Sequence, residues 1–162
     1  MSQDILFLTA LIAVILMGSA MCSGIEAALL AVNPLRVHEL ARRNPKVLGA
    51  RRLEKLRHRI GRTLTVVTIA NNSFNIFGSL MVGSYATYIF QDRIGNVKPI
   101  FFIGLTILVL LLGEIVPKAL GTRLALQISL TSAPILDFLS IVMKPLLIVL
   151  ERLHQSSLRR AS

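Results

Sequence analysis

The sequence predicts an all-α membrane protein with three transmembrane helices, and its composition and charge carry that prediction. Apolar residues make up 54% of the 162 residues and charged residues only 16%, against roughly 25% charged in an average soluble domain. The mean hydropathy is +0.69. The net charge is nonetheless +10, which fits a membrane protein whose basic residues gather on one side of the bilayer. Disorder and a disulfide scaffold are excluded, because the chain is strongly apolar and has one cysteine, Cys22.

The first expected span covers residues 5–32. The stretch Ile5–Met21 carries no charge, and about 20 apolar residues cross a bilayer as a helix. A cleaved signal peptide is the alternative interpretation. It is disfavoured because the block is long and no basic residue precedes it.

Residues 33–62 form a basic segment that fixes the expected topology. Ten of the 18 Lys and Arg residues lie there, so the positive-inside rule places this segment in the cytoplasm. The stretch is rich in helix-forming residues and is interrupted by Pro45 and Gly49, which predicts a helical hairpin lying against lipid head groups. Recognition of anionic lipid is a second interpretation. Nucleic-acid binding is disfavoured, because no aromatic side chains alternate with the charges.

The second and third expected spans cover residues 63–90 and 99–116. The second carries no charge, the third carries Glu114 near its end, and the segment 91–98 between them is short. Three spans place the two termini on opposite sides of the membrane. We therefore expect a multi-pass protein of the cell or inner membrane, with its N-terminus outside and its C-terminus in the cytoplasm.

Residues 124–155 are expected to form juxtamembrane amphipathic helices. Asp137, Ser140, Lys144 and Glu151 are spaced so that they share one helical face, and Pro145 interrupts the helix. This pattern favours helices that lie in the inner interface. A fourth span is the alternative, and it would move the C-terminus outside.

Each expected span also contains a cluster of polar or helix-breaking residues. The clusters are Ser19, Ser23 and Glu26 in the first span, Asn71, Asn72 and Asn75 in the second, and Gly113, Glu114, Pro117 and Lys118 at the end of the third. Hydrogen-bonded packing between helices is the simplest explanation for the serines and asparagines. Glu114 and Lys118 also have the spacing of an i,i+4 ion pair near a helix end. An ionisable residue inside a span nevertheless indicates function by default.

The chemistry of the three clusters suits a hard cation. Hydroxyl, amide and carboxylate oxygens are ligands for Mg²⁺, Ca²⁺ or Na⁺ rather than for Zn²⁺ or Cu⁺. Pro117 has no N–H, so the carbonyl of Gly113, four residues earlier, loses its helical partner. That carbonyl is a further candidate oxygen ligand, as in transporters with interrupted helices.

These motifs resemble the transmembrane domain of the CorC/CNNM family. The resemblance is carried by Ser19 with the string Ser23-Gly24-Ile25-Glu26, by Asn71-Asn72 with Asn75, and by Gly113-Glu114-Ile115-Val116-Pro117-Lys118. The family usually has a small residue where Ile25 stands. The resemblance implies Mg²⁺ transport, as export proposed to be coupled to Na⁺, by a homodimer. It further implies a metal site at Ser19, Ser23, Asn71, Asn75, Gly113 and Glu114.

We expect residues 1–162 to form a single transmembrane domain of this type. Full-length family members continue into cytosolic CBS domains, which are expected to be absent from this chain. No phosphate-cradling motif occurs, so we expect no ATP hydrolysis by this chain. We expect a transporter of metal ions in contact with membrane lipid, and neither an enzyme nor a partner of nucleic acid. A membrane anchor and dimerisation module for cytosolic sensor domains is the alternative function.

Overall fold

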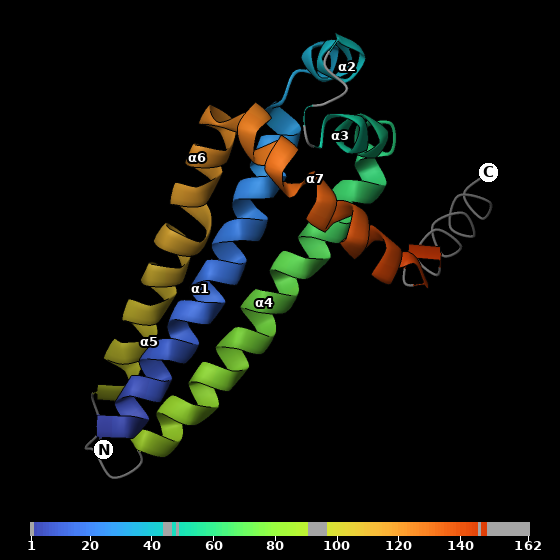
Figure 1. Ribbon diagram of the computed structural model, residues 1–162. Helices are drawn as coiled ribbons and strands as arrows, with labels where there is room; N and C mark the ends of the chain where they lie inside the picture. Colours follow the sequence, from blue (N-terminus) through green and yellow to red (C-terminus); the bar gives the residue numbers. More distant parts are fainter. Residues whose placement is uncertain (1, 44–46, 48, 91–96, 146, 149–162) are drawn as a thin grey trace, which may run out of the picture.

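The computed structural model describes residues 2–43, 47, 49–90, 97–145 and 147–148, and every secondary-structure element in that part of the chain is a helix (Figure 1). Three long rods run side by side and form a bundle. They are α1 (Ser2–Ala31), α4 (Ile60–Ile89), and a third rod made of α5 (Val97–Leu108), the π-helix η1 (Val109–Ile115) and α6 (Val116–Arg123). The expected all-α membrane fold class is therefore confirmed.

Helices α1 and α4 lie antiparallel, so the N-terminus of α1 is beside the end of α4, and the two helices spread apart toward their other ends (Figure 1). Small residues on each helix receive large residues from the other. Gly18 of α1 faces Phe74, and Gly78 of α4 faces Ile15 so closely that a methyl group at either glycine would overlap the facing side chain. This interlocking fixes the register of the two helices, which sets the polar residues at their centres opposite each other.

The third rod packs against α1 through an equally close approach. Gly121 of α6 lies against the backbone carbonyl of Gly24 and against Ala27. A side chain at position 121 would overlap that carbonyl, so glycine is what allows the backbones of α1 and α6 to meet. Small residues at an interface are the usual means of close packing between membrane helices.

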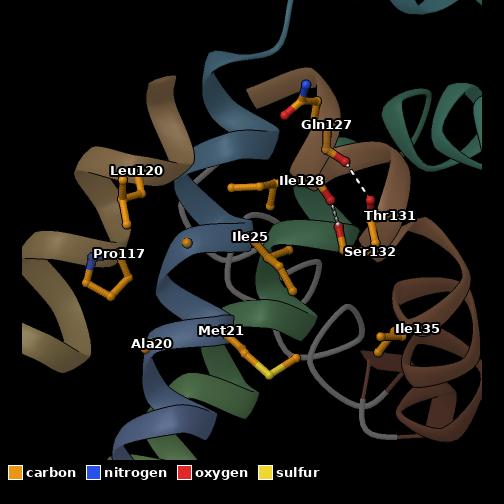
Figure 2. A pocket seen from close by; sticks show the side chains of 11 residues that line it. Ala20, Met21, Ile25, Pro117, Leu120, Gln127, Ile128, Thr131, Ser132 and Ile135 are labelled. Carbon is orange, nitrogen blue, oxygen red and sulfur yellow. Dashed lines mark hydrogen bonds between the residues drawn. The ribbon is translucent and has the colours of Figure 1, made fainter. Parts of the chain in front are cut away.

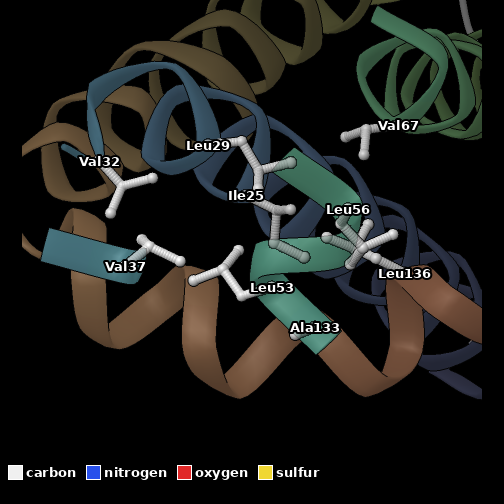
Figure 3. Close-up of a cluster of buried hydrophobic side chains, with 9 residues drawn as sticks. All are labelled: Ile25, Leu29, Val32, Val37, Leu53, Leu56, Val67, Ala133 and Leu136. Atoms are coloured by element: carbon white, nitrogen blue, oxygen red, sulfur yellow. The ribbon is translucent and has the colours of Figure 1, made fainter. Parts of the chain in front are cut away.

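A cap of three helices covers one end of the bundle (Figure 1). The cap consists of α2 (Pro34–Arg43), α3 (Ala50–Arg57) and α7 (Ala125–Val142). Figure 3 shows the apolar core that joins the cap to α1 and α4. The buried members of that core are Ile25, Leu29, Val32, Val37, Leu53, Leu56, Val67, Ala133 and Leu136.

The two short helices α2 and α3 form the expected hairpin. Gly49 precedes α3 with φ of +89°, a conformation that favours glycine. Its Cα lies so close to the carbonyl of Leu130 in α7 that a side chain would overlap it. Residues 44–46 of the connection, which include Pro45, lie outside the described residues. The hairpin is more than a solvated layer over head groups, because its apolar face is buried against α1 and α7.

In the part of the chain that the structure describes, three helices are long and apolar enough to span a membrane, which confirms a multi-pass membrane protein. They are Gln3–Ala31, Pro99–Arg123 and Ala125–Val142. The number of such helices agrees with the three expected spans, but they are not the same three segments. Helix α4 is absent from the set although it has 30 residues and lies along α1, because its asparagines lower its hydropathy. Helix α7, which the sequence predicts to be interfacial, qualifies by length and composition.

Two helix ends differ from the expectation. The third rod continues through Pro117 to Arg123 rather than ending at residue 116, because the π-helix before Pro117 changes the backbone spacing where proline would break an α-helix. Helix α7 tolerates Pro134 inside it and ends at Val142, three residues before Pro145. Glu151 and the expected helix beyond residue 148 lie outside the described residues.

Candidate metal centre

Helix α1 brings two serines to the centre of the bundle. Ser19 and Ser23 are one helical turn apart on the face that meets α4 and η1, and both are 0% exposed. Ser19 lies near the middle of the candidate span Gln3–Ala31, and Ser23 lies one turn further toward its end. The sequence pattern therefore places two buried hydroxyl groups inside the span, where each needs a polar neighbour.

Helix α4 supplies that neighbour through Asn71. Its Oδ1 accepts hydrogen bonds from Ser19 Oγ at 3.2 Å and from Ser23 Oγ at 3.5 Å. Asn71 is 6% exposed. These distances exceed the usual 2.7–2.8 Å of a hydroxyl hydrogen bond, so the three groups converge without satisfying one another strongly.

The π-helix η1 contributes a backbone oxygen to the same cluster. Ser19 Oγ lies 3.4 Å from the carbonyl oxygen of Gly113. A Cβ atom at position 113 would lie 3.3 Å from Ser19 Oγ, which is a tight contact, so the absent side chain keeps this approach open. π-helical segments inside longer helices occur frequently at functional sites, and this one lies near the middle of Pro99–Arg123.

Glu114 and Asn75 complete the cluster and leave one oxygen without a partner. Asn75 Nδ2 donates to Glu114 Oε1 at 3.2 Å. The opposite assignment of the amide would bring two oxygens together, so donation to the carboxylate is the consistent one. Asn75 Oδ1 is buried and has no hydrogen-bond partner among the described residues. Such an orphaned acceptor is costly unless a cation or a water molecule meets it.

The arrangement offers hard oxygen atoms of four kinds in the interior of the bundle. They come from hydroxyl, amide, carboxylate and backbone carbonyl groups, which suit Mg²⁺, Ca²⁺ or Na⁺. Within the described residues, no group of three or more His, Cys, Asp or Glu side chains is positioned to hold a metal ion. A cation at this site would therefore meet mainly neutral oxygens with a single carboxylate, that of Glu114.

Other residues of the sequence clusters lie away from this centre. Asn72 and Lys118 are exposed, and Glu114 forms no ion pair with Lys118 in the described part of the chain. Glu26 lies in α1 beyond Ser23, toward the cap, and its Oε1 accepts a hydrogen bond from Thr68 Oγ1 at 2.9 Å. Sequence reasoning missed Thr68, although it lies three residues before Asn71 on a neighbouring face of α4.

Comparison with known proteins agrees with this fold. Residues 10–161 match the family described as CNNM, cyclin M transmembrane N-terminal domain. The chain is 38% identical over 148 residues to the UPF0053 protein sll1254 of Synechocystis, covering 90% of this chain and 41% of that protein. It is 28% identical over 142 residues to the UPF0053 inner membrane protein YfjD of Escherichia coli, covering 87% of this chain and 32% of that protein. A UPF0053 protein of Haemophilus influenzae is 33% identical, with 87% and 32% covered. The chain thus spans between about a third and two fifths of these relatives.

Proposed function

Because this chain belongs to the CNNM family of cyclin M transmembrane domains, we propose that it carries Mg²⁺ across a membrane. The cation is held between α1, α4 and η1. Its ligands are drawn from the oxygens of Ser19, Ser23, Asn71, Asn75, Gly113 and Glu114. In this proposal Mg²⁺ is the transported substrate, and Na⁺ is the coupling ion that the family resemblance implies.

The unpartnered oxygen of Asn75 is the observation that carries the proposal. A buried amide oxygen without a partner costs about 1–3 kcal/mol, and it lies beside the carboxylate of Glu114. A cation next to both oxygens would remove that cost and would offset the negative charge. The long hydrogen bonds among Ser19, Ser23 and Asn71 point the same way, because their oxygens can turn toward an ion without losing strong bonds.

The position of the cluster supports transport by alternating access. Secondary transporters bind their ions near the middle of the membrane, where a spanning helix is interrupted. Here the interruption is η1, which carries Gly113 and Glu114 and ends two residues before Pro117. We propose that rocking of the third rod against α1 and α4 exposes the cation first to the cytoplasm and then to the outside, which corresponds to export.

Mg²⁺ flux through the purified chain in vesicles tests this proposal. Glu114→Gln removes the one carboxylate of the cluster and Ser23→Ala removes one hydroxyl, and we expect both variants to lose most of the flux. Glu39→Gln is the matched control, because that glutamate forms an exposed ion pair with Arg43. Retained flux in both site variants would overturn the assignment of the site.

A membrane anchor and dimerisation module is the second candidate function. It is favoured by the hydrogen bonds from Ser19 and Ser23 to Asn71, which would serve helix packing. Thermal unfolding in detergent separates the two functions. A transporter gains stability with Mg²⁺, because a ligand stabilises the state that binds it, and Glu114→Gln removes the gain. An anchor shows the same melting temperature with and without Mg²⁺.

We propose a homodimer in the cell membrane, with the basic cap in the cytoplasm and α4 crossing the bilayer beside α1. The name of the E. coli relative places that protein in the inner membrane, which supports this location. Cytosolic CBS domains are proposed as partners in a longer form, because the relatives are more than twice the length of the match.

A further inference from the structure

Two cavities meet at the capped end of the bundle, and neither belongs to the metal centre. The first is an apolar groove of about 500 Å³ between α1, α6 and α7 (Figure 2). Its lining residues are Ala20, Met21, Gly24, Ile25, Pro117, Leu120, Gln127, Ile128, Thr131, Ser132 and Ile135. The second, the basic pocket, has about 380 Å³ and is lined by Ala31, Val32, Asn33, Arg36, Arg123, Leu124, Ala125, Leu126 and Gln127.

The groove presents an almost wholly apolar surface to its contents. Its two hydroxyl groups are already bonded within α7, since Thr131 Oγ1 donates to the carbonyl of Gln127 at 2.9 Å and Ser132 Oγ donates to the carbonyl of Ile128 at 2.7 Å (Figure 2). Met21, Ile25, Pro117 and Leu120 project into the space from the other helices. The volume lies within the range of about 300–1,000 Å³ of ligand-binding pockets.

The basic pocket offers two positive charges that have no counter-ion. Arg36 and Arg123 line it, and in the described part of the chain neither side chain forms an ion pair or a hydrogen bond. Among the described residues that line the two cavities, none is acidic. The first turn of α7 also lines the pocket and has no side-chain cap, so its amide groups favour an anion. The C-terminal ends of α1 and α6 also border the pocket, and their carbonyl groups disfavour an anion. The two arginines are therefore the main groups that attract an anion to the pocket.

The two cavities are neighbours, in the order that an amphipathic ligand requires. Gln127 lines both, and in Figure 2 its amide lies at the top of the view, above Ile128 and Thr131. Arg123 is the last residue of the candidate span Pro99–Arg123, whereas Pro117 and Leu120 lie further inside it. The charged pocket is therefore at head-group depth and the groove is at hydrocarbon depth.

We propose that this composite cavity binds one anionic glycerophospholipid of the membrane leaflet that faces the cap. Its phosphate lies between Arg36 and Arg123, and an acyl chain fills the apolar groove beside Pro117. Charge complementarity selects an anionic head group, and the groove requires an acyl chain, so a free phosphate compound matches only half of the site. The proposal does not depend on Mg²⁺ transport.

Competition between two lipids tests the proposal. The purified chain in detergent is incubated with equal amounts of phosphatidylglycerol and phosphatidylcholine, and native mass spectrometry counts the bound lipid. We expect phosphatidylglycerol to be preferred. Replacing Arg36→Gln and Arg123→Gln together lowers that preference about 30-fold, which is the effect of two arginines near an anionic surface. Each single replacement lowers it about fivefold.

Matched controls separate the site from general charge. Arg51→Gln with Arg52→Gln removes two exposed arginines of the same cap that line neither cavity. In this double variant the preference for phosphatidylglycerol over phosphatidylcholine is expected to remain unchanged. An equal loss in this control would overturn the proposal.

Filling the groove tests the acyl chain separately. Thr131→Phe puts a ring into the groove and is expected to lower the occupancy of both lipids, whereas Thr122→Phe on the exposed surface of α6 leaves it unchanged. Unchanged occupancy in Thr131→Phe, or equal competition by glycerol phosphate, would contradict a lipid site. Circular dichroism of every variant, compared with the unmodified chain, shows that the losses come from folded protein.

Discussion

At the scale of single residues, the sequence identified the polar groups but not the direction in which each one points. Asn71, Asn72 and Asn75 look equivalent in the sequence. In the structure Asn71 and Asn75 turn toward the bundle, while Asn72 is exposed. Helical spacing predicts that 71 and 75 share a face, but only the packing of α4 against α1 determines that this face lies inside.

Asn75 and Asn72 give a matched pair of variants. Asn75→Leu removes the unpartnered Oδ1 and the donor to Glu114, so we expect the Mg²⁺-dependent rise in melting temperature to disappear. Asn72→Leu changes an exposed side chain outside the cluster, so the rise is expected to remain. Melting curves with and without Mg²⁺ measure both, and an equal effect of the two replacements would contradict the arrangement of the site.

The helix around Gly113 shows what sequence reasoning can and cannot provide. The absence of an N–H in Pro117 predicts a disturbed helix four residues earlier, and the disturbance is found there as η1. The form of the disturbance could not be predicted, because a kink, a broken helix and a π-helix all relieve the same clash. The choice depends on how the third rod packs on α1 at Gly24 and Gly121.

At the scale of helices, glycines decide how closely the rods approach. Gly121→Ala would push a methyl group against the carbonyl of Gly24, so we expect a loss of about 1–3 kcal/mol in the free energy of unfolding. Gly104→Ala is the matched control in the same rod, because nothing lies within 4 Å of the position of its added Cβ. Denaturation in detergent checks the pair. Because alanine has the higher helix propensity, Gly104→Ala should leave the free energy of unfolding unchanged or raise it. An equal loss at both positions would contradict the close packing at Gly121.

The cap depends on the apolar core that it shares with the bundle. Leu53 of α3 is 0% exposed and belongs to this core with Leu29 and Leu136 (Figure 3). Leu53→Ala leaves a cavity, and a loss of about 2–5 kcal/mol in the free energy of unfolding is expected. Leu35→Ala, at a side chain 76% exposed, is the control and should cost far less. Equal costs would place the hairpin away from the bundle.

The cap was only partly predictable from the sequence. Its helices follow from composition and from the breaks at Pro45 and Gly49, but its packing depends on contacts between segments far apart in the chain. One example is the bond from Arg57 Nη1 to the carbonyl of Leu29 at 2.6 Å, which joins α3 to the end of α1. The position of helix α7 is the part of the fold that the sequence predicts least well, because an apolar helix with one polar face suits either the interface or the membrane.

At the scale of the whole molecule, the distribution of charge predicts the orientation. Ten basic residues lie in 33–62, so the cap is expected to face the cytoplasm. Cys22 is the chain's one cysteine. Replacing it with alanine allows a single cysteine to be placed at Arg51, and a membrane-impermeant maleimide should label that site only after the cytoplasmic side is opened. Labelling of intact cells would contradict the orientation.

The same method decides the position of α7. We expect Lys144→Cys, at an exposed side chain just beyond α7, to be labelled from the same side as Arg51→Cys, because α7 packs against α3 across the end of the bundle (Figure 1). Labelling from opposite sides would show that α7 spans the bilayer, as its length and composition permit.

The central claim is that Mg²⁺ binds among the oxygens of α1, α4 and η1, and the most direct test is an experimental structure of the chain determined with Mg²⁺. We predict density for one ion between Ser19, Asn75 and Gly113, close to the carboxylate of Glu114. Its distances to the coordinating oxygens should be about 2.0–2.1 Å, the value for Mg²⁺ rather than Ca²⁺. A cluster without an ion at saturating Mg²⁺, with Asn75 Oδ1 bonded instead to a neighbouring helix, would contradict the claim.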